Sequence, residues 1–248
     1  GRLACGAMGQ GRLADVEEIK DRIRSALSNG PLQGKHALVT AGPTYEYIDP
    51  VRFIGNRSSG KMGFAMAEAL QQSGASVTLV AGPTSLPDPS GIQTVRVVSA
   101  QDMYDAVRQI YATVDLVVMS AAVADYRPDH MESQKIKKGA SRDLHLVRTT
   151  DILASLGQEK QHQFLVGFAA ETQDLLSYAA AKLQEKNLDM IVANDVSQPE
   201  AGFDGDTNIV TVLYNDEGRI QQQDFPLQTK KMAAKQIVAL IAQRLSSR

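Results

Sequence analysis

A segment rich in glycine and serine has the residue types that bind phosphate. It reads Gly55-Asn56-Arg57-Ser58-Ser59-Gly60-Lys61-Met62. The first seven positions match a P-loop, but Met62 stands where a Ser or Thr would hold Mg²⁺, and residues 41–54 separate the segment from the nearest predicted strand. Small residues still let the backbone approach an anion, and the helix predicted from Phe64 offers N–H groups at its start. We therefore expect phosphate binding here, with a plain helix-capping loop as the alternative.

A second segment, in a predicted loop, concentrates positive charge at Lys135, Lys137 and Lys138. Such a cluster suits a triphosphate, whose charge grows during displacement. The alternative is a solvated surface run, and the residues alone favour neither.

Several single residues have polar or aromatic groups that a ligand could use. Asp125 follows an apolar run and could accept hydrogen bonds from a ribose, although an isolated carboxylate is more often a turn residue. Lys182 and Lys186 share one face of a predicted helix. Asn194-Asp195 follows a buried strand, and Phe168 ends another, where core packing is commoner than base stacking.

Composition and charge exclude several classes of protein. Apolar residues at 43% and charged residues at 22% are typical of a globular domain. The formal net charge of -2 gives no general attraction to nucleic acid or to an anionic membrane, so a phosphate site must be local. The single cysteine, Cys5, excludes an internal disulfide, and the four histidines lack metal-ligand spacing. We expect an intracellular, cytoplasmic protein, because no apolar run approaches the about 18 residues of a membrane span.

Short apolar runs alternate with helical patterns from His36 onward. The predicted strands are 37–40, 77–80, 94–98, 116–119, 164–168 and 190–193, and the predicted helices are 64–73, 100–111 and 174–186. An antiparallel hairpin follows at 208–225, and then a last helix that presents Ala233, Ile237, Leu240 and Ile241 on one face. The prediction is an α/β fold: a Rossmann-like, mostly parallel sheet with helices on both faces, plus a C-terminal antiparallel hairpin.

The remaining segments suggest a boundary and a ligand edge. Residues 1–33 hold one helical pattern, Val16 to Leu27, closed by turn residues, and we expect the main domain to be 34–248. The chain opens at Gly1 without a methionine, which indicates a fragment or a processed product. Residues 41–63 and 124–143 read as long polar loops beyond the carboxyl ends of parallel strands, where ligands bind.

Taken together, these stretches resemble one family, the synthetase half of the bacterial bifunctional phosphopantothenoylcysteine decarboxylase/synthetase. The matching stretches are Thr40–Thr44, Asp49–Ile54, Asn56–Gly63, Ala121–Tyr126, Lys135–Lys138, Val166–Thr172, Lys186–Asp189 and Asn194–Val196. The residues before Arg12 look like the end of the flavin-dependent decarboxylase half, in which Cys5 corresponds to a proton-donor cysteine. Because the flavin-binding body is absent, we expect Cys5 to be without decarboxylase activity.

The resemblance implies a ligase of coenzyme A biosynthesis. In the reaction that the resemblance implies, the 4'-phosphopantothenate carboxylate would attack the α-phosphate of CTP, release pyrophosphate and form an acyl-cytidylate, from which L-cysteine would displace CMP. Arg52 and Asn56 would hold phosphopantothenate and the intermediate, and Lys135 would steady the developing phosphate charge. The residues expected at the nucleotide are Ser58, Ser59, Gly60, Lys61, Met119, Ser120, Ala121, Asp125, Thr150, Asp151, Ile152, Leu153, Phe168, Lys182 and Lys186. Lys61 is included for its place in the phosphate segment, since the resemblance gives it no role. Mg²⁺ would bridge the triphosphate and need few protein ligands.

Two departures and two rival functions accompany this reading. Arg57 stands where the family often has histidine, and the segment after Lys138 is slightly shorter than in some relatives. Family members are dimers, which makes the hairpin at 208–225 a candidate dimerisation element.

One rival function is that of a nicotinamide-dependent oxidoreductase, which is disfavoured because no G-x-G-x-x-G follows a predicted strand. The other is a regulatory module that binds nucleotide without releasing pyrophosphate.

Overall fold

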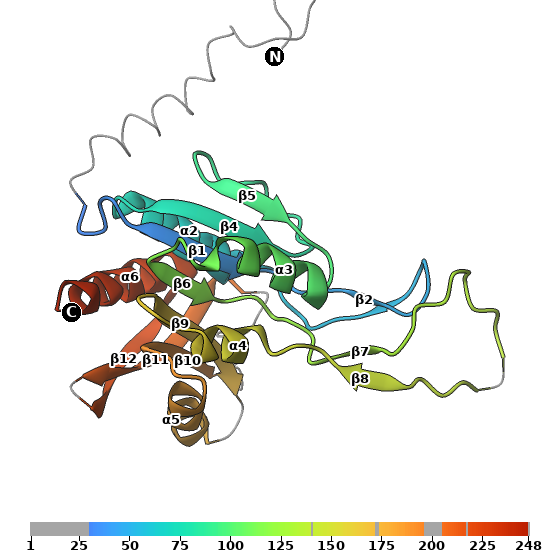
Figure 1. Cartoon of the computed structure of the whole chain (residues 1–248). Coiled ribbons are helices and arrows are strands. Elements are labelled where there is room, and N and C mark those ends of the chain that lie inside the picture. Colours follow the sequence, from blue (N-terminus) through green and yellow to red (C-terminus); the bar gives the residue numbers. More distant parts are fainter. Residues whose placement is uncertain (1–29, 140, 172–173, 196–204, 217, 248) are drawn as a thin grey trace, which may run out of the picture.

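The structure is a computed structural model that describes residues 30–139, 141–171, 174–195, 205–216 and 218–247. A central eight-stranded sheet has the order β12-β11-β10-β9-β6-β1-β4-β5, with helices on both faces (Figure 1). Its strands are β1 (His36–Ala41), β4 (Ser76–Ala81), β5 (Gln93–Arg96), β6 (Leu116–Met119), β9 (Phe164–Glu171), β10 (Met190–Asp195), β11 (Thr207–Asp216) and β12 (Arg219–Thr229). The helices are α2 (Lys61–Gln72), α3 (Ala100–Tyr111), α4 (Ile152–Gln158), α5 (Leu175–Glu185) and α6 (Lys230–Ser246).

The pairing of the strands confirms the predicted fold class. Strands β1, β4, β5, β6, β9 and β10 pair in parallel, and β11 and β12 extend the sheet as an antiparallel hairpin. Ser99 is the N-cap of α3 and forms a capping box with Asp102: the Ser99 hydroxyl accepts from the Asp102 N–H, and the Asp102 carboxylate accepts from the Ser99 N–H. The helix predicted from Phe64 begins earlier, at Lys61, and the hairpin reaches further, from 207 to 229.

Two apolar cores cover the two faces of the sheet. On one face α2 and α6 pack on the strands through residues such as Leu70 and Ile237, and on the other α3, α4 and α5 do so through Met103 and Leu156. Neighbouring residues of one strand therefore enter different cores, which is why these strands read as continuous apolar runs. With the helices on the faces, the carboxyl edge of the sheet is left for loops.

Helix α2 lies unusually close to β1, and Gly63 permits it. A Cβ atom on Gly63 would lie 2.5 Å from Ala41 Cβ and 2.9 Å from the Thr40 carbonyl oxygen. We expect Gly63→Ala to lower the free energy of unfolding by about 1–3 kcal/mol in urea titrations, because overpacking outweighs alanine's better helix propensity. The control is Gly139→Ala, whose added Cβ would meet only the Ser141 carbonyl oxygen at 3.9 Å. Equal stability of the two variants would contradict this account of the contact.

An arm built from residues 45–54, 126–139 and 141–148 projects from the body beyond β6 (Figure 1). It contains two short two-stranded sheets, β2 (Glu46–Tyr47) with β3 (Phe53–Ile54), and β7 (Tyr126–Pro128) with β8 (Leu146–Arg148). The two predicted loops are thus partly strand, and the Glu132 N–H donates to the Ile48 carbonyl at 2.9 Å to join them. Large apolar side chains are exposed along the arm at Tyr47, Val51, Phe53, Tyr126, Met131, Leu144 and Leu146.

Some predictions fall at or beyond the limits of the described residues. The helical pattern from Val16 to Leu27 and Cys5 lie outside them. The expected boundary after residue 33 falls in the turn at 31–34, beside Leu32, which is buried in the core. Among the described helices, none has both the length and the apolar character that a membrane span requires.

Candidate active site

A cleft of about 780 Å³ opens at the carboxyl edge of the sheet. Every residue predicted to contact the nucleotide lines it, and Asn56 does so as well. The structure brings these residues together from five separate stretches of sequence, because parallel strands deliver their following loops to one edge. Arg52 and Lys135 are not among the lining residues, whereas Asn194, Asn208 and Lys230 are.

The start of α2 forms the floor that suits an anion. Its N-cap residue, Gly60, has φ 78° and no side-chain cap, and the first turn carries no acidic residue. The Ser58 hydroxyl accepts from the Gly60 N–H at 3.3 Å, and the Thr84 hydroxyl donates to the Ser59 carbonyl at 3.1 Å, so both hold the loop's own shape. A helix start without an acidic residue suits negative charge, so phosphate binding at this segment stays a prediction beside that of an ordinary capping loop.

Asn56 connects the phosphate loop with the segment that follows β6. Its Nδ2 donates to the Val123 carbonyl at 2.9 Å. The same segment is held by the Thr44 hydroxyl, which accepts from the Ala124 N–H at 3.0 Å, and by the Thr149 N–H, which donates to the Asp125 carbonyl at 3.0 Å. These bonds place the Asn56 amide and the exposed Asp125 carboxylate in one cleft.

The opposite wall combines an aromatic ring with positive charge. Phe168 is partly buried against the core and also lines the cleft, while base stacking on its ring stays a prediction. Lys182 and Lys186 line the wall from α5, and Lys186 Nζ lies 2.7 Å from Asp151 Oδ2. Burial raises the pKa of Asp151, but the hydrogen bond from Lys186 and that from the Ala154 N–H outweigh it, so the pKa is lowered. The wall therefore presents an aromatic ring and two lysines to the cleft.

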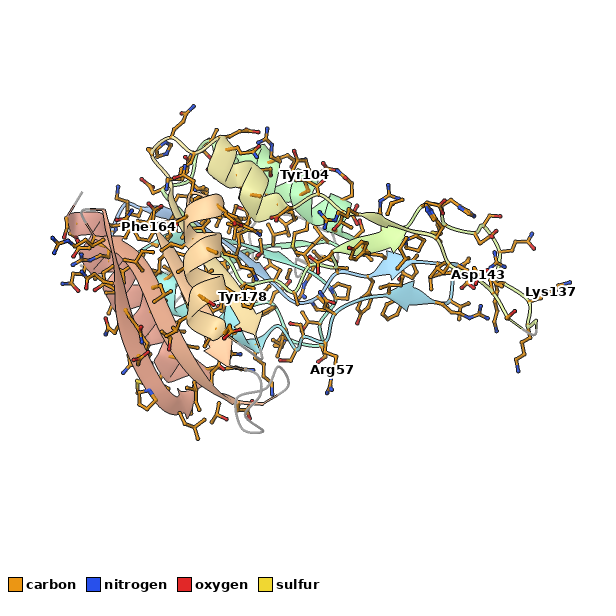
Figure 2. All side chains as sticks on the ribbon, turned by 90° about the horizontal axis from the view of Figure 1, so that it is seen from below. Arg57, Tyr104, Lys137, Asp143, Phe164 and Tyr178 are labelled. Atoms are coloured by element: carbon orange, nitrogen blue, oxygen red, sulfur yellow. The ribbon has the colours of Figure 1, made fainter. Side chains whose placement is uncertain are left out.

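The arm holds the other two predicted residues at a distance from this cleft. The buried Asp49 carboxylate accepts from the N–H groups of Val51 at 2.8 Å, Arg52 at 2.9 Å and Ile136 at 3.2 Å. Arg52 Nη2 donates to the Ile136 carbonyl at 3.1 Å, which fixes Arg52 beside the lysine cluster. Figure 2 shows Lys137 at the far end of the arm, pointing outward, with Arg57 much nearer the body. A single chain therefore does not assemble Arg52, Asn56 and Lys135 in one site.

Asp49 is expected to order the arm in a pH-dependent way. Burial raises the pKa of Asp49, but the hydrogen bonds from Val51, Ile136 and Arg52 together with the Arg52 charge lower it by more. The pKa in the folded state therefore lies below the pKa in the unfolded state. The contribution of Asp49 is then fully present above the unfolded value of about 3.9 and is lost as pH falls through the folded pKa.

Asp49→Asn tests this role directly. It removes the charge and one acceptor, and we expect roughly tenfold faster hydrogen exchange at the Val51 and Ile136 amides at neutral pH. Asp88→Asn is the control, because Asp88 and Arg96 form an exposed ion pair on the surface, where the loss of a charge has little effect. Unchanged exchange in the Asp49 variant would show that the arm is ordered by other contacts.

Several of the cleft residues were missed by sequence reasoning, among them Arg148, Thr149, Asn208 and Lys230. Asn208 lies near the start of β11 and Lys230 begins α6, and neither carried a local signal beyond its secondary structure. Asn194 was noticed only as a residue that follows a buried strand. In the part of the chain that the structure describes, no group of three or more His, Cys, Asp or Glu side chains could hold a metal ion.

Comparison with known proteins gives a consistent result. Residues 32–245 match the family described as DNA/pantothenate metabolism flavoprotein C-terminal domain. The chain is 48% identical over 247 residues to the coenzyme A biosynthesis bifunctional protein CoaBC of Bacillus subtilis, covering 98% of this chain and 60% of that protein. It is 44% identical over 249 residues to the protein of the same name from Vibrio cholerae, covering 99% and 61%. This chain thus spans about 60% of the length of these relatives.

A solved structure gives the same answer for the fold. The crystal structure of the C-terminal domain of a coenzyme A biosynthesis bifunctional protein CoaBC superposes with a TM-score of 0.76 at 47% sequence identity. It covers 89% of this chain and 100% of that domain. The sheet, its helices and the appended hairpin therefore form a known arrangement.

Proposed function

The chain belongs to the family of the DNA/pantothenate metabolism flavoprotein C-terminal domain, and from this premise we propose that it is a ligase joining 4'-phosphopantothenate to L-cysteine in coenzyme A biosynthesis. The observation that carries the proposal is the cleft, in which Asn56, the uncapped start of α2 and the Phe168 wall face one space. The names of the relatives, coenzyme A biosynthesis bifunctional proteins, support the pathway. Their greater length supports a fusion with a decarboxylase in the parent protein.

The proposed reaction has two displacement steps. A carboxylate oxygen of phosphopantothenate attacks the α-phosphorus of CTP, and the bond to pyrophosphate breaks. The cysteine nitrogen then attacks the acyl carbon, CMP leaves with the bonding electrons, and the nitrogen loses its proton to solvent. Both steps increase negative charge on phosphate oxygens, which favours fixed positive groups around them.

Residues of the cleft supply those groups in this proposal. The start of α2 and Lys61 bind phosphate oxygens, Phe168 stacks on the base, and Lys182 and Lys186 lie over the adjoining wall. Asn56 holds the acyl intermediate with an amide that donates and accepts without adding charge. When bound, Mg²⁺ would neutralise part of the triphosphate charge; the exposed Asp125 carboxylate suits this ion, which commonly takes only one or two protein carboxylates.

We further propose that the active enzyme is a homodimer in which the arm of one copy reaches the cleft of the other. Arg52 and Lys135 lie on the arm and outside the cleft of their own chain. The arm's exposed apolar side chains are the kind of surface that a second copy covers. The hairpin at 208–225 is a weaker candidate, because β12 exposes Gln221, Gln222 and Gln223. A two-fold axis would then complete both sites at once.

Pyrophosphate release tests the proposed function. The purified chain is assayed with Mg²⁺ and phosphopantothenate, with CTP or ATP, and with or without cysteine. The expected result is release that requires phosphopantothenate and favours CTP, with CMP formed when cysteine is present. A folded protein that binds CTP but releases no pyrophosphate in any combination would instead favour the regulatory nucleotide-binding module.

A further inference from the structure

Two buried polar side chains occupy the end of the cleft that the proposed mechanism leaves unused. Asn208, from β11, is 3% exposed, and Lys230, the first residue of α6, is 6% exposed. Both line the cleft with the phosphate-loop residues Gly60 and Lys61. Polar side chains this deeply buried carry a desolvation cost that hydrogen bonds or ion pairs, from the protein or from a ligand, offset.

Lys230 belongs to a small group of charges at the starts of two helices. Lys61, the first residue of α2, lies 2.6 Å from Asp206 Oδ1, and the Lys230 N–H donates to the Asp206 carbonyl at 2.8 Å. The hydrogen bond from Lys61 and the charges of Lys61 and Lys230 lower the pKa of Asp206. Asp206 is itself 83% exposed, so this carboxylate is accessible to solvent and replaceable.

Asn208 gives a second, independent sign of a ligand. Its Oδ1 receives no hydrogen bond from any described residue, although the side chain is buried. A buried amide oxygen without a donor is uncommon in native proteins. Because no donor holds Oδ1 in place, the amide can turn about its last side-chain bond and present Nδ2 to an anion.

The packing of the two helices brings these groups to the phosphate loop. Helices α2 and α6 pack side by side on the same face of the sheet and both begin at its carboxyl edge (Figure 1). Asn56 lies beside the segment after β6, whereas Asn208 is the second residue of β11, three strands along the sheet. A polyphosphate that reacts beside Asn56 would therefore extend over α2 toward α6.

We propose that Lys230 and Asn208 bind the terminal phosphates of the nucleoside triphosphate, which leave as pyrophosphate, and that the Asp206 carboxylate occupies the place of a phosphate group at Lys61 until nucleotide binds. This inference rests on the proposed function, because it assigns residues to the same nucleotide. On binding, phosphate oxygens replace the Asp206 carboxylate at Lys61. The Asn208 amide donates one hydrogen bond to them.

Lys230→Gln is the first test, with Lys231→Gln as its matched control. Both variants remove one charge from the same turn, but Lys231 is 79% exposed and faces Glu68 at 3.6 Å. Calorimetry on the purified chain would measure the affinity for CTP, inorganic pyrophosphate and CMP. We expect Lys230→Gln to weaken the binding of CTP and of pyrophosphate roughly tenfold to a hundredfold, because one charged hydrogen bond is lost. The affinity for CMP should stay within about threefold of that of the wild-type chain.

Several outcomes would overturn the assignment. Equal affinities of the Lys230→Gln and Lys231→Gln variants for CTP and pyrophosphate would do so. A loss of CMP affinity in Lys230→Gln as large as the loss of CTP affinity would do so as well. If wild-type chain binds CTP normally while these comparisons fail, only this inference is lost. If wild-type chain binds neither CTP nor pyrophosphate, the proposed function is lost with it.

Two further variants keep the test informative if Lys230→Gln fails to fold. Asp206→Asn removes the competing carboxylate from an exposed position, and we expect pyrophosphate to bind about threefold to tenfold more tightly. Asn208→Leu has nearly the same size and removes the unpaired oxygen, so we expect an unchanged or higher Tm together with weaker pyrophosphate binding. The proposal would be contradicted if Asp206→Asn did not bind pyrophosphate more tightly than the wild-type chain. It would also be contradicted if Asn208→Leu bound pyrophosphate as tightly as the wild-type chain.

Discussion

Asn56→Asp is expected to reduce ligation roughly a hundredfold to a thousandfold while CTP affinity changes by less than about threefold. In the structure the Asn56 Nδ2 donates to the Val123 carbonyl at 2.9 Å. Aspartate replaces that donor with an oxygen, which repels the carbonyl and places a negative charge beside an anionic acyl intermediate. Nucleotide binding depends mainly on the α2 start and the Phe168 wall, so it should persist. The measurements are the kcat for pyrophosphate release and the Kd for CTP.

The control for this variant is Asn215→Asp in the hairpin. There the side-chain Oδ1 accepts from the Gly218 N–H at 2.9 Å, a bond that aspartate retains, and the residue lies outside the cleft. We expect wild-type turnover in this control. Turnover that is also unchanged in Asn56→Asp would remove Asn56 from the reacting site.

Mixing two inactive variants is expected to restore activity if the arm of each copy completes the cleft of the other. Asn56→Asp damages the cleft, and Lys135→Gln damages the arm. A dimer that contains one of each has one intact cleft facing one intact arm. After random exchange of subunits, about a quarter of all sites would be functional, so we expect about a quarter of wild-type turnover. The measurement is pyrophosphate release from the mixture after co-refolding.

A second mixture serves as the control for subunit exchange. Arg52→Gln and Lys135→Gln both damage the arm, so every mixed site would contain one damaged arm and no activity should return. Arg52 and Lys135 lie together on the arm, since Arg52 Nη2 donates to the carbonyl of Ile136, the residue after Lys135, at 3.1 Å. Equal failure of both mixtures would show that Lys135 acts within its own chain, which would require the arm to bend back to its own cleft.

The central fold could be predicted because its signals are local and repeated. Continuous apolar runs such as Leu116–Met119 indicate strands buried on both faces, and Ser99 with Asp102 marks a helix start through bonds formed within one turn. The short strands of the arm could not be predicted, because β2 and β3 contain two residues each and show no periodicity. Their pairing depends on partners elsewhere in the chain, including the Glu132 N–H that donates to Ile48.

The sequence by itself determined the α/β class, the edge of the sheet where a ligand would bind, and most of the residues that line the cleft. The class and the edge depend on local patterns and on the rule that the loops after parallel strands gather at one edge, whereas most of the lining residues were expected from the family resemblance. Only the tertiary structure decided that Lys230 and Asn208 join the cleft, since the packing of α6 on α2 brings them there. It also separated Arg52 and Lys135 from Asn56, because the buried Asp49 carboxylate binds the Ile136 N–H and ties them to the arm. Contacts between residues so far apart in the chain leave no local trace in the sequence.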